Sequence, residues 1–251
     1  MSVIYEPKGR ALEYSWLACN LFSGCVHGCA YCYVPNALHK TTKEFHANAT
    51  PRRAILEELR KDCIKFAGTK KRLLLCFTCD PYPPRDMEMG ITREALLILR
   101  EHKIPFQILT KAGTRALRDF DLYGPNDAFA TTLTYLQDDG KSLEIEPGAA
   151  LPSDRIRAIR AAKKQGLTTW VSLEPVLDPD ESLMCIEETH KIVDLYKIGK
   201  LNHRSSDTDW RQFGTDAIRL CESYGVPYYV KTDLAEYLKG VKFKNTESRS
   251  I

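Results

Sequence analysis

The sequence predicts an α/β fold, namely a partial (open) TIM-type (β/α)6 barrel with an additional C-terminal strand. Apolar runs of strand length alternate with helical patterns along the chain, as they do in βαβ units around a parallel sheet. Six strand–helix units and one further strand can be counted, whereas eight units would close a full barrel. The loops after the strand C-termini should then form the functional face.

The predicted strands are short apolar runs that stop at polar or turn-forming residues. The second stops at Asp80, which opens a proline-rich turn, and the fifth stops at Pro175. The strands are expected at residues 14–20, 72–79, 106–111, 127–134, 168–174, 195–200 and 226–231.

The predicted helices have apolar residues at helical spacing between recognisable ends. Thr50 and Pro51 have the residue types of an N-cap and a first-turn proline, which would open a helix that ends near Phe66. Gly166 and Gly225 follow two later helices as C-terminal stops. The helices are expected at residues 50–66, 91–101, 114–120, 152–165, 181–191, 208–224 and 234–239.

Length and composition are those of one large domain. The 251 residues suffice for a substantial core, so we expect a single domain over 1–251, with an N-terminal arm at 1–13 and a flexible polar tail at 242–251. The apolar fraction of 43% and the charged fraction of 27% are ordinary for soluble globular proteins. No apolar run approaches the roughly 18–20 residues of a membrane span. Residues 1–8 lack the apolar segment of a signal peptide.

The cysteine count indicates the cellular compartment, and the net charge indicates which partners are possible. The chain has nine cysteines, an odd number with three close together, which argues against a disulfide framework and favours a reducing cytoplasm. The net charge of +3 and the pI near 8.3 permit a nucleic-acid partner. They do not require one, because dedicated nucleic-acid-binding domains are usually more basic.

The most informative stretch is the loop at residues 24–33. Cys25, Cys29 and Cys32 stand at the spacing C-x3-C-x2-C, which can wrap three thiolates around one face of an iron–sulfur cluster. Ordinary [4Fe–4S] centres have four thiolates, so one iron would remain free to bind a small molecule. The alternative is a zinc site, but zinc favours paired C-x2-4-C spacings and only one C-x2-C occurs here.

These cysteines, with Tyr31 before the last one, resemble the cluster motif of the radical S-adenosylmethionine (SAM) superfamily. Residues 5–9, 20–22 and 78–80 also resemble the spore photoproduct lyase-like branch, the DNA repair photolyase group. The resemblance implies a [4Fe–4S] cluster whose open iron binds SAM, and reductive cleavage of SAM to a 5′-deoxyadenosyl radical. It also implies a partial barrel and an external electron donor such as flavodoxin or ferredoxin.

The resemblance assigns several SAM contacts near the cluster loop. Tyr31 is expected near the adenine, and Thr78 and Asp80 at the amino group. A carboxylate suits a charged ammonium group, but Asp80 is equally suited to cap the turn that it makes with Pro81. Lys111, at the end of the third strand, is expected to pair with the SAM carboxylate.

Two further strand ends carry expected SAM contacts. Thr131, Thr132 and Thr134 close the fourth strand, where the family often has a hydroxyl for the SAM carboxylate or ribose. Glu174 follows the fifth strand and is placed for a ribose hydroxyl or a substrate. A carboxylate before Pro175 is also a common turn cap.

Three residues are expected to take part in the radical chemistry. By resemblance, Tyr33 is a substrate or radical-relay residue; alternatively, its ring packs the cluster loop against solvent. The hydrogen-donor cysteine of the lyase family stands immediately before the threonine, where this chain has Phe77. Cys76 and Cys79 lie on either side and should face opposite sides of the strand. Either could replace that donor, and both also suit small buried apolar positions.

The resemblance points to a damaged or modified nucleobase in DNA as substrate. Basic residues that could meet its phosphates follow the sixth strand or lie in the last one: Lys197, Lys200, His203, Arg204 and Lys231. Aromatic residues available for base stacking are Tyr82, Trp170 and Trp210, of which Trp170 is expected in the core. Residues expected on a solvated helix face are Arg155, Arg157, Arg160, Lys163 and Lys164. His27 is expected to pack or to face solvent.

Two other functions remain open. The first is the same radical chemistry on RNA, a peptide or a small metabolite. The second is a non-catalytic iron–sulfur or zinc module that senses redox state or binds nucleic acid, which would cleave no SAM.

Overall fold

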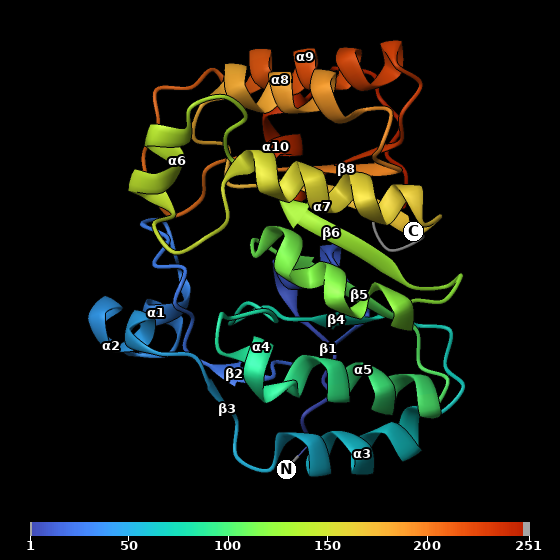
Figure 1. Ribbon diagram of the computed structural model, residues 1–251. Helices are drawn as coiled ribbons and strands as arrows, with labels where there is room; N and C mark the ends of the chain where they lie inside the picture. The colour runs from blue at the N-terminus through green and yellow to red at the C-terminus, as the bar shows by residue number, and fades with distance from the viewer. Residues whose placement is uncertain (1, 248–251) are drawn as a thin grey trace.

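The computed structural model describes residues 2–247 and contains a curled, open sheet of seven parallel strands (Figure 1). Their spatial order is β1-β4-β5-β6-β7-β8-β9, so each new strand adds to the same edge. The strands are β1 (Leu17–Ala18), β4 (Leu73–Leu75), β5 (Phe106–Thr110), β6 (Ala128–Thr132), β7 (Thr168–Leu173), β8 (Leu195–Ile198) and β9 (Tyr228–Val230). The predicted open (β/α) barrel with an additional C-terminal strand is confirmed.

Helical segments connect successive strands and cover the convex side of the sheet (Figure 1). The longer ones are α3 (Ile55–Phe66), α5 (Ile91–Glu101), η2 (Gly113–Leu122), α7 (Pro152–Lys164), α8 (Pro179–Thr189) and α9 (Trp210–Ser223). Short helices are η1 (Gly9–Glu13), α1 (Val34–Ala37), α2 (Thr42–Ala47), α4 (Asp86–Met89), α6 (Asp139–Ile145), α10 (Thr232–Ala235) and η3 (Glu236–Leu238). No helix among residues 2–247 is both long and apolar enough to cross a bilayer.

The core lies mainly between the sheet and these helices, with a smaller cluster on the concave side. Side chains that alternate along β4 belong to the two clusters in turn. Leu73 and Leu75 belong to the main core, and Leu74 belongs to the concave-side cluster, called the inner cluster below. Trp170 of β7 is fully buried in the inner cluster, which confirms its predicted core position. The inner cluster closes the bottom of the barrel and leaves the strand C-termini open for a site.

The predicted helix start at Thr50 and Pro51 is wrong. Both residues form β3 (Thr50–Pro51), which pairs antiparallel with β2 (Phe22–Ser23). The helix α3 begins only at Ile55. The local N-cap pattern is overridden by this pairing, which ties the chain after α2 back to the residues that precede the cluster loop.

The second strand is shorter than predicted, and one inference drawn from it is wrong. β4 ends at Leu75, and the chain bends at residues 77–79 instead of running straight to Cys79. Cys76 and Cys79 therefore do not occupy opposite faces of a strand. Part of the predicted tail, residues 248–251, lies outside the described residues.

Candidate active site

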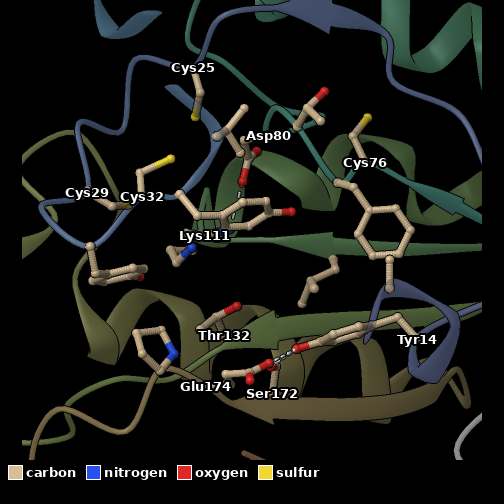
Figure 2. Close-up of a pocket in the computed structure, with 18 of the residues that line it drawn as sticks. Tyr14, Cys25, Cys29, Cys32, Cys76, Asp80, Lys111, Thr132, Ser172 and Glu174 are labelled. Carbon is tan, nitrogen blue, oxygen red and sulfur yellow. Dashed lines mark hydrogen bonds between the residues drawn. The ribbon is translucent and has the colours of Figure 1, made fainter. Parts of the chain in front are cut away.

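A cavity of about 490 Å³ opens at the C-terminal ends of the strands. Its walls come from the cluster loop, from the N-terminal segment that includes Tyr14, from the last residue of β6, and from the segments that follow β4, β5, β7, β8 and β9. Figure 2 shows how these segments bring side chains from distant parts of the chain to one space. Parallel strands end at a common edge, which explains why residues far apart in sequence meet there.

The three cysteines of the motif all line this cavity. Gly24, with φ of +80°, starts their loop, and a Cβ at this position would lie 2.0 Å from the Asn48 carbonyl oxygen. The peptide N–H of Cys25 donates to the Phe45 carbonyl at 3.2 Å, and that of Cys32 donates to the Cys29 carbonyl at 3.0 Å. The loop is thus compact and fixed at its start, and its three cysteines line one cavity (Figure 2).

Three cysteine thiols are a donor set that suits an iron–sulfur cluster. Among residues 2–247, no group of three or more His, Cys, Asp or Glu side chains is close enough to hold one ion. Zinc needs all its thiolates about 2.3 Å from one centre, whereas a cluster binds each cysteine through a different iron. Burial raises the pKa of Cys25 to about 12, so binding a metal here must release a proton.

A segment before α7 braces the cluster loop. The peptide N–H of Ala30 donates to Ile145 at 2.8 Å, and that of Gly148 donates to His27 at 2.9 Å. A Cβ on Gly148 would lie 2.2 Å from the Val26 carbonyl oxygen, so only glycine allows this approach. This brace, which spans residues 145–150, was not predicted from the sequence. Its Pro-Gly pair signals a turn, but nothing in it signals the docking.

The brace also carries a buried ion pair that holds Tyr31. The Tyr31 hydroxyl donates to one oxygen of Glu146, and Arg155 donates to the other. Thr134 adds a hydrogen bond to Glu146 at 3.1 Å. Both Glu146 and Arg155 have fully buried side chains, so the prediction that Arg155 lies on a solvated helix face is wrong. Arg155 lies in the first turn of α7, which faces the brace. Its planar guanidinium group has the geometry to pair with the Glu146 carboxylate.

Lys111 extends into the cavity beside Tyr31. Its ammonium nitrogen lies 5.6 Å from the centre of the Tyr31 ring. Among the described residues, none accepts a hydrogen bond from it (Figure 2). Burial alone would lower the pKa of Lys111, but the negative charges of Cys29 and Glu146 outweigh it, and the pKa is raised. A charged, unpaired ammonium group in a cavity is suited to an anionic ligand.

Asp80 lines the cavity and also caps its own turn. It accepts hydrogen bonds from the Tyr82 N–H at 2.9 Å, the Thr110 hydroxyl at 2.8 Å and the Lys111 N–H at 2.9 Å. These bonds tie the end of β4 to the end of β5. His27 packs behind it, with Nδ1 3.6 Å from an Asp80 oxygen, and burial lowers the pKa of His27 to about 4.

The threonines fall into two groups. Thr78 and Thr132 line the cavity. The Thr131 hydroxyl instead donates to the Thr110 carbonyl at 2.7 Å, and Thr134 bonds to Glu146. The alternation of β6 places neighbouring side chains on opposite faces, so only one of Thr131 and Thr132 can face the cavity.

Glu174 lies at the other side of the cavity, in a network that the sequence did not reveal. It accepts hydrogen bonds from the Tyr14 hydroxyl at 2.6 Å and from the Asn202 amide at 2.8 Å, and it pairs with Lys231 (Figure 2). Burial, followed by the adjacent Glu174 charge, raises the pKa of Tyr14 well above its ordinary value. Tyr14 and Asn202 come from separate loops, so no sequence spacing links them.

The prediction that basic residues meet substrate phosphates, and the prediction that aromatic residues stack on bases, are both partly wrong. Lys197 is buried 4.3 Å from the Trp170 ring centre, and Lys231 is buried against Glu174, so neither is free for phosphates. Tyr82 and Trp210 are buried as well and cannot stack on bases. Lys200 and His203 line the cavity as predicted basic residues, and Arg204 donates to the Ala30 carbonyl.

Tyr33 and the two remaining cysteines also line the cavity. Tyr33 has 48% of its surface exposed, and its ring centre lies 6.1 Å from that of His203. Cys76 and Cys79 are 5% and 8% exposed. Of the residues predicted to hold the cluster, contact SAM or take part in the radical chemistry, all line the cavity except Thr131 and Thr134, whose hydroxyls bond within the protein.

Comparison with known proteins gives the family. The sequence model of the Radical SAM superfamily matches residues 19–193. A viral protein, ORF301 of Acidianus two-tailed virus, is 27% identical over 201 residues, which cover 74% of this chain and 64% of that protein. The chain thus spans less than two thirds of that relative's length.

Solved structures share the fold. A variant of spore photoproduct lyase has a TM-score of 0.66 at 13% identity, over 86% of this chain and 76% of that chain. SuiB of Streptococcus suis bound to SAM has a TM-score of 0.64 at 12% identity, over 90% of this chain and 51% of that chain. The fold is thus like that of spore photoproduct lyase. Since the family model covers more than half of the chain, the protein belongs to the radical SAM superfamily, which implies SAM and an iron–sulfur cluster as cofactors.

Proposed function

We propose that this protein is an enzyme that uses a [4Fe–4S] cluster to cleave SAM and acts on a damaged or modified nucleobase in DNA. One observation carries the proposal: three thiols and the unpaired ammonium group of Lys111 line the same cavity. That combination suits a cluster and an anionic group beside it. A cytoplasmic setting agrees with a chain that keeps nine free thiols.

Cys25, Cys29 and Cys32 hold the cluster in this proposal. When bound, the cluster supplies the electron that cleaves SAM and yields a 5′-deoxyadenosyl radical, and a flavodoxin or ferredoxin supplies that electron in turn. The chain's own contribution is to orient the ligands and to exclude water from the cavity.

We assign the SAM contacts to residues that line the cavity. Lys111 binds the SAM carboxylate, Tyr31 contacts the adenine, and the hydroxyls of Thr78 and Thr132 complete the site. Glu174 has carboxylate oxygens that can each accept more than one hydrogen bond, so a ribose hydroxyl can join its present partners.

Thr131 acts behind this surface, and Asp80, which lines the cavity, acts through its neighbours. Asp80 fixes the main chain of Lys111 through its N–H, and Thr131 fixes the end of β5 through Thr110. Their substitution should therefore weaken SAM binding through the position of their neighbours.

We assign Tyr33, Cys76 and Cys79 to the step that returns a hydrogen atom to the substrate radical. The two cysteines stand one and two residues from Phe77 in the chain and line the cavity, and Tyr33 lies at the exposed rim between the cluster loop and His203.

A DNA substrate is supported by the rim and by one neighbour. Lys8, Arg10, Lys200 and His203 give the mouth of the cavity a basic lining. A spore photoproduct lyase variant with bound AdoMet and dinucleoside spore photoproduct has a TM-score of 0.65 at 14% identity.

A peptide substrate is the second candidate. SuiB bound to the precursor peptide SuiA has a TM-score of 0.66 at 11% identity, over 90% of this chain and 52% of that chain. Binding to DNA that weakens steeply with salt would favour the first candidate, because released counterions drive such binding. The same binding assay, carried out with RNA and with small metabolites, tests these other classes of substrate.

The decisive experiment is anaerobic cluster reconstitution followed by chromatography for 5′-deoxyadenosine after adding SAM and dithionite. We expect the nucleoside from the natural chain and from Cys63→Ala, whose cysteine lies outside the cavity, and none from Cys29→Ala. A fully loaded cluster that never cleaves SAM, even with candidate substrates, would instead favour a non-catalytic iron–sulfur module.

A further inference from the structure

Cys76 and Cys79 form a pair of thiols in the wall of the cavity. Because the chain bends at residues 77–79 after β4 ends, these two residues, three positions apart, both reach the cavity wall. Both residues line the cavity and keep a small exposed area. In Figure 2, Cys76 lies beyond Asp80 as seen from Cys25.

The side chain of Asn20 holds this bend. Its Oδ1 accepts hydrogen bonds from the N–H groups of Phe77 and Thr78, both at 2.8 Å. Its Nδ2 donates to the Tyr5 hydroxyl at 2.9 Å. Asn20 is 5% exposed and uses both ends of its amide, so its orientation is fixed. A residue from another element therefore builds the C-x-x-C turn.

The remaining cysteines outside the cluster loop differ from this pair. Cys19, Cys63, Cys185 and Cys221 have no exposed surface and do not line the cavity. They suit the role of small apolar core residues. Among the cysteines outside the cluster loop, only Cys76 and Cys79 combine the C-x-x-C spacing with access to the cavity.

We propose that Cys76 and Cys79 are a redox-active dithiol that a small organic disulfide oxidises to an intramolecular disulfide. One cysteine attacks a sulfur of the external disulfide, whose S–S bond breaks as one of its thiols leaves. The second cysteine attacks the mixed disulfide, forms the Cys76–Cys79 bond and releases the other thiol. The two cysteine protons end on the two leaving thiols, and the external disulfide gains the two electrons that the pair loses.

The cavity selects the class of partner. Both cysteines are exposed only slightly and at the cavity wall, so a low-molecular-weight thiol or disulfide can reach them whereas the flat surface of a folded protein cannot. If the proposed function holds, this pair also controls it. Only the S–H form can give a hydrogen atom to a substrate radical, and the disulfide has none.

The test is a redox titration read by mass spectrometry. The cluster-loaded protein is equilibrated anaerobically in mixtures of reduced and oxidised dithiothreitol, quenched in denaturant, alkylated with N-ethylmaleimide and digested with trypsin. Cleavage after Arg72 and Arg85 releases peptide 73–85, which contains this pair and no other cysteine. The cluster cysteines fall in peptide 11–40, and Cys63 falls in a third peptide.

We expect peptide 73–85 to lose both alkyl groups, and the mass of two hydrogens, as the oxidised fraction rises. The change should reverse with reduced reagent, while Cys63 stays alkylated throughout. Cys79→Ser should trap Cys76 as a mixed disulfide with cystamine, and Cys63→Ser should leave the titration unchanged.

A peptide 73–85 that stays doubly alkylated in fully oxidised dithiothreitol would overturn the inference. So would separate mixed adducts on both cysteines without a bond between them. SAM cleavage, measured on the same reduced samples, separates the two proposals. Cleavage without the disulfide overturns this inference alone, and the disulfide without cleavage overturns the proposed function alone.

Discussion

The Tyr31 hydroxyl donates a hydrogen bond to Glu146, a residue 115 positions further along the chain. Burial alone would raise the pKa of Glu146, but the charges of Arg155 and Lys111 outweigh it and lower the pKa. Glu146 is therefore an anion that is fully buried beside the cluster loop. The position of Tyr31, and with it the end of the cysteine motif, depends on this buried charge pair.

Glu146→Gln should destabilise the protein by about 3–5 kcal/mol, because the change leaves the Arg155 guanidinium buried without its counter-charge. Urea unfolding followed by circular dichroism measures this loss. Glu94→Gln is the matched control, since Glu94 is exposed on α5 and should cost almost nothing.

Removing the second charge tests the same relationship. Glu146→Gln combined with Arg155→Met should recover part of the lost stability, because no unpaired charge remains. A double variant that is less stable than Glu146→Gln would show that packing, and not the charge pair, dominates at this position.

Gly148→Ala should lower the iron content of the reconstituted protein several-fold. The added methyl would lie 2.2 Å from the Val26 carbonyl oxygen, so the brace must move away from the cluster loop. Gly140→Ala is the control from α6, where the nearest atom is 3.4 Å away, an ordinary contact. Iron analysis and the visible absorption of the cluster provide the measurement. Equal loading of both variants would contradict the bracing role.

The fold was predictable because its pattern is repetitive. Apolar runs and helical patterns alternate, and that alternation specifies parallel strands whose ends meet. The cysteine motif and Lys111 were found because they are local signals at a loop and a strand end. Strand limits were less accurate: the bend after Leu75 depends on Asn20, whose role is set by tertiary contact and has no local pattern.

The parts of the site that sequence reasoning missed all depend on long-range pairing. Arg155 is one of several basic residues on α7, and only the position of Glu146 decides that it is buried while Arg157 stays 72% exposed. Likewise, Lys231 is unavailable to phosphates because its ammonium group pairs with Glu174 and donates a hydrogen bond to the Tyr14 hydroxyl. Charge patterns along one helix or strand do not contain this information.

Lys111→Met should weaken SAM binding by about 10- to 100-fold, the effect of losing one hydrogen bond to a charged group. The side chain keeps its apolar stem, so the cavity wall should remain intact. Isothermal titration of the cluster-loaded protein with SAM measures the change, and Lys70→Met, at an exposed position, is the control. Unchanged SAM affinity would remove Lys111 from the proposed contacts.

The N-terminal arm should detach in acid because of Asp62. Burial alone would raise the pKa of Asp62, but bonds from the Ile4 N–H, Ser2, Lys65 and the Val3 N–H lower it to about 2. A carboxyl with a lowered pKa contributes its full stability above its ordinary pKa of 3.8. That stability is lost as the pH falls from about 4 to about 2, because the unfolded chain takes up the proton first.

Asp62→Asn isolates this contribution. The variant should be less stable than the natural chain at neutral pH, and the difference between the two should shrink as the pH falls through the same window. Urea unfolding midpoints at a series of pH values give the comparison. Asp180→Asn, at an exposed position of α8, is the control and should track the natural chain. A constant difference between Asp62→Asn and the natural chain at every pH would mean that shape, and not the charge of Asp62, holds the arm.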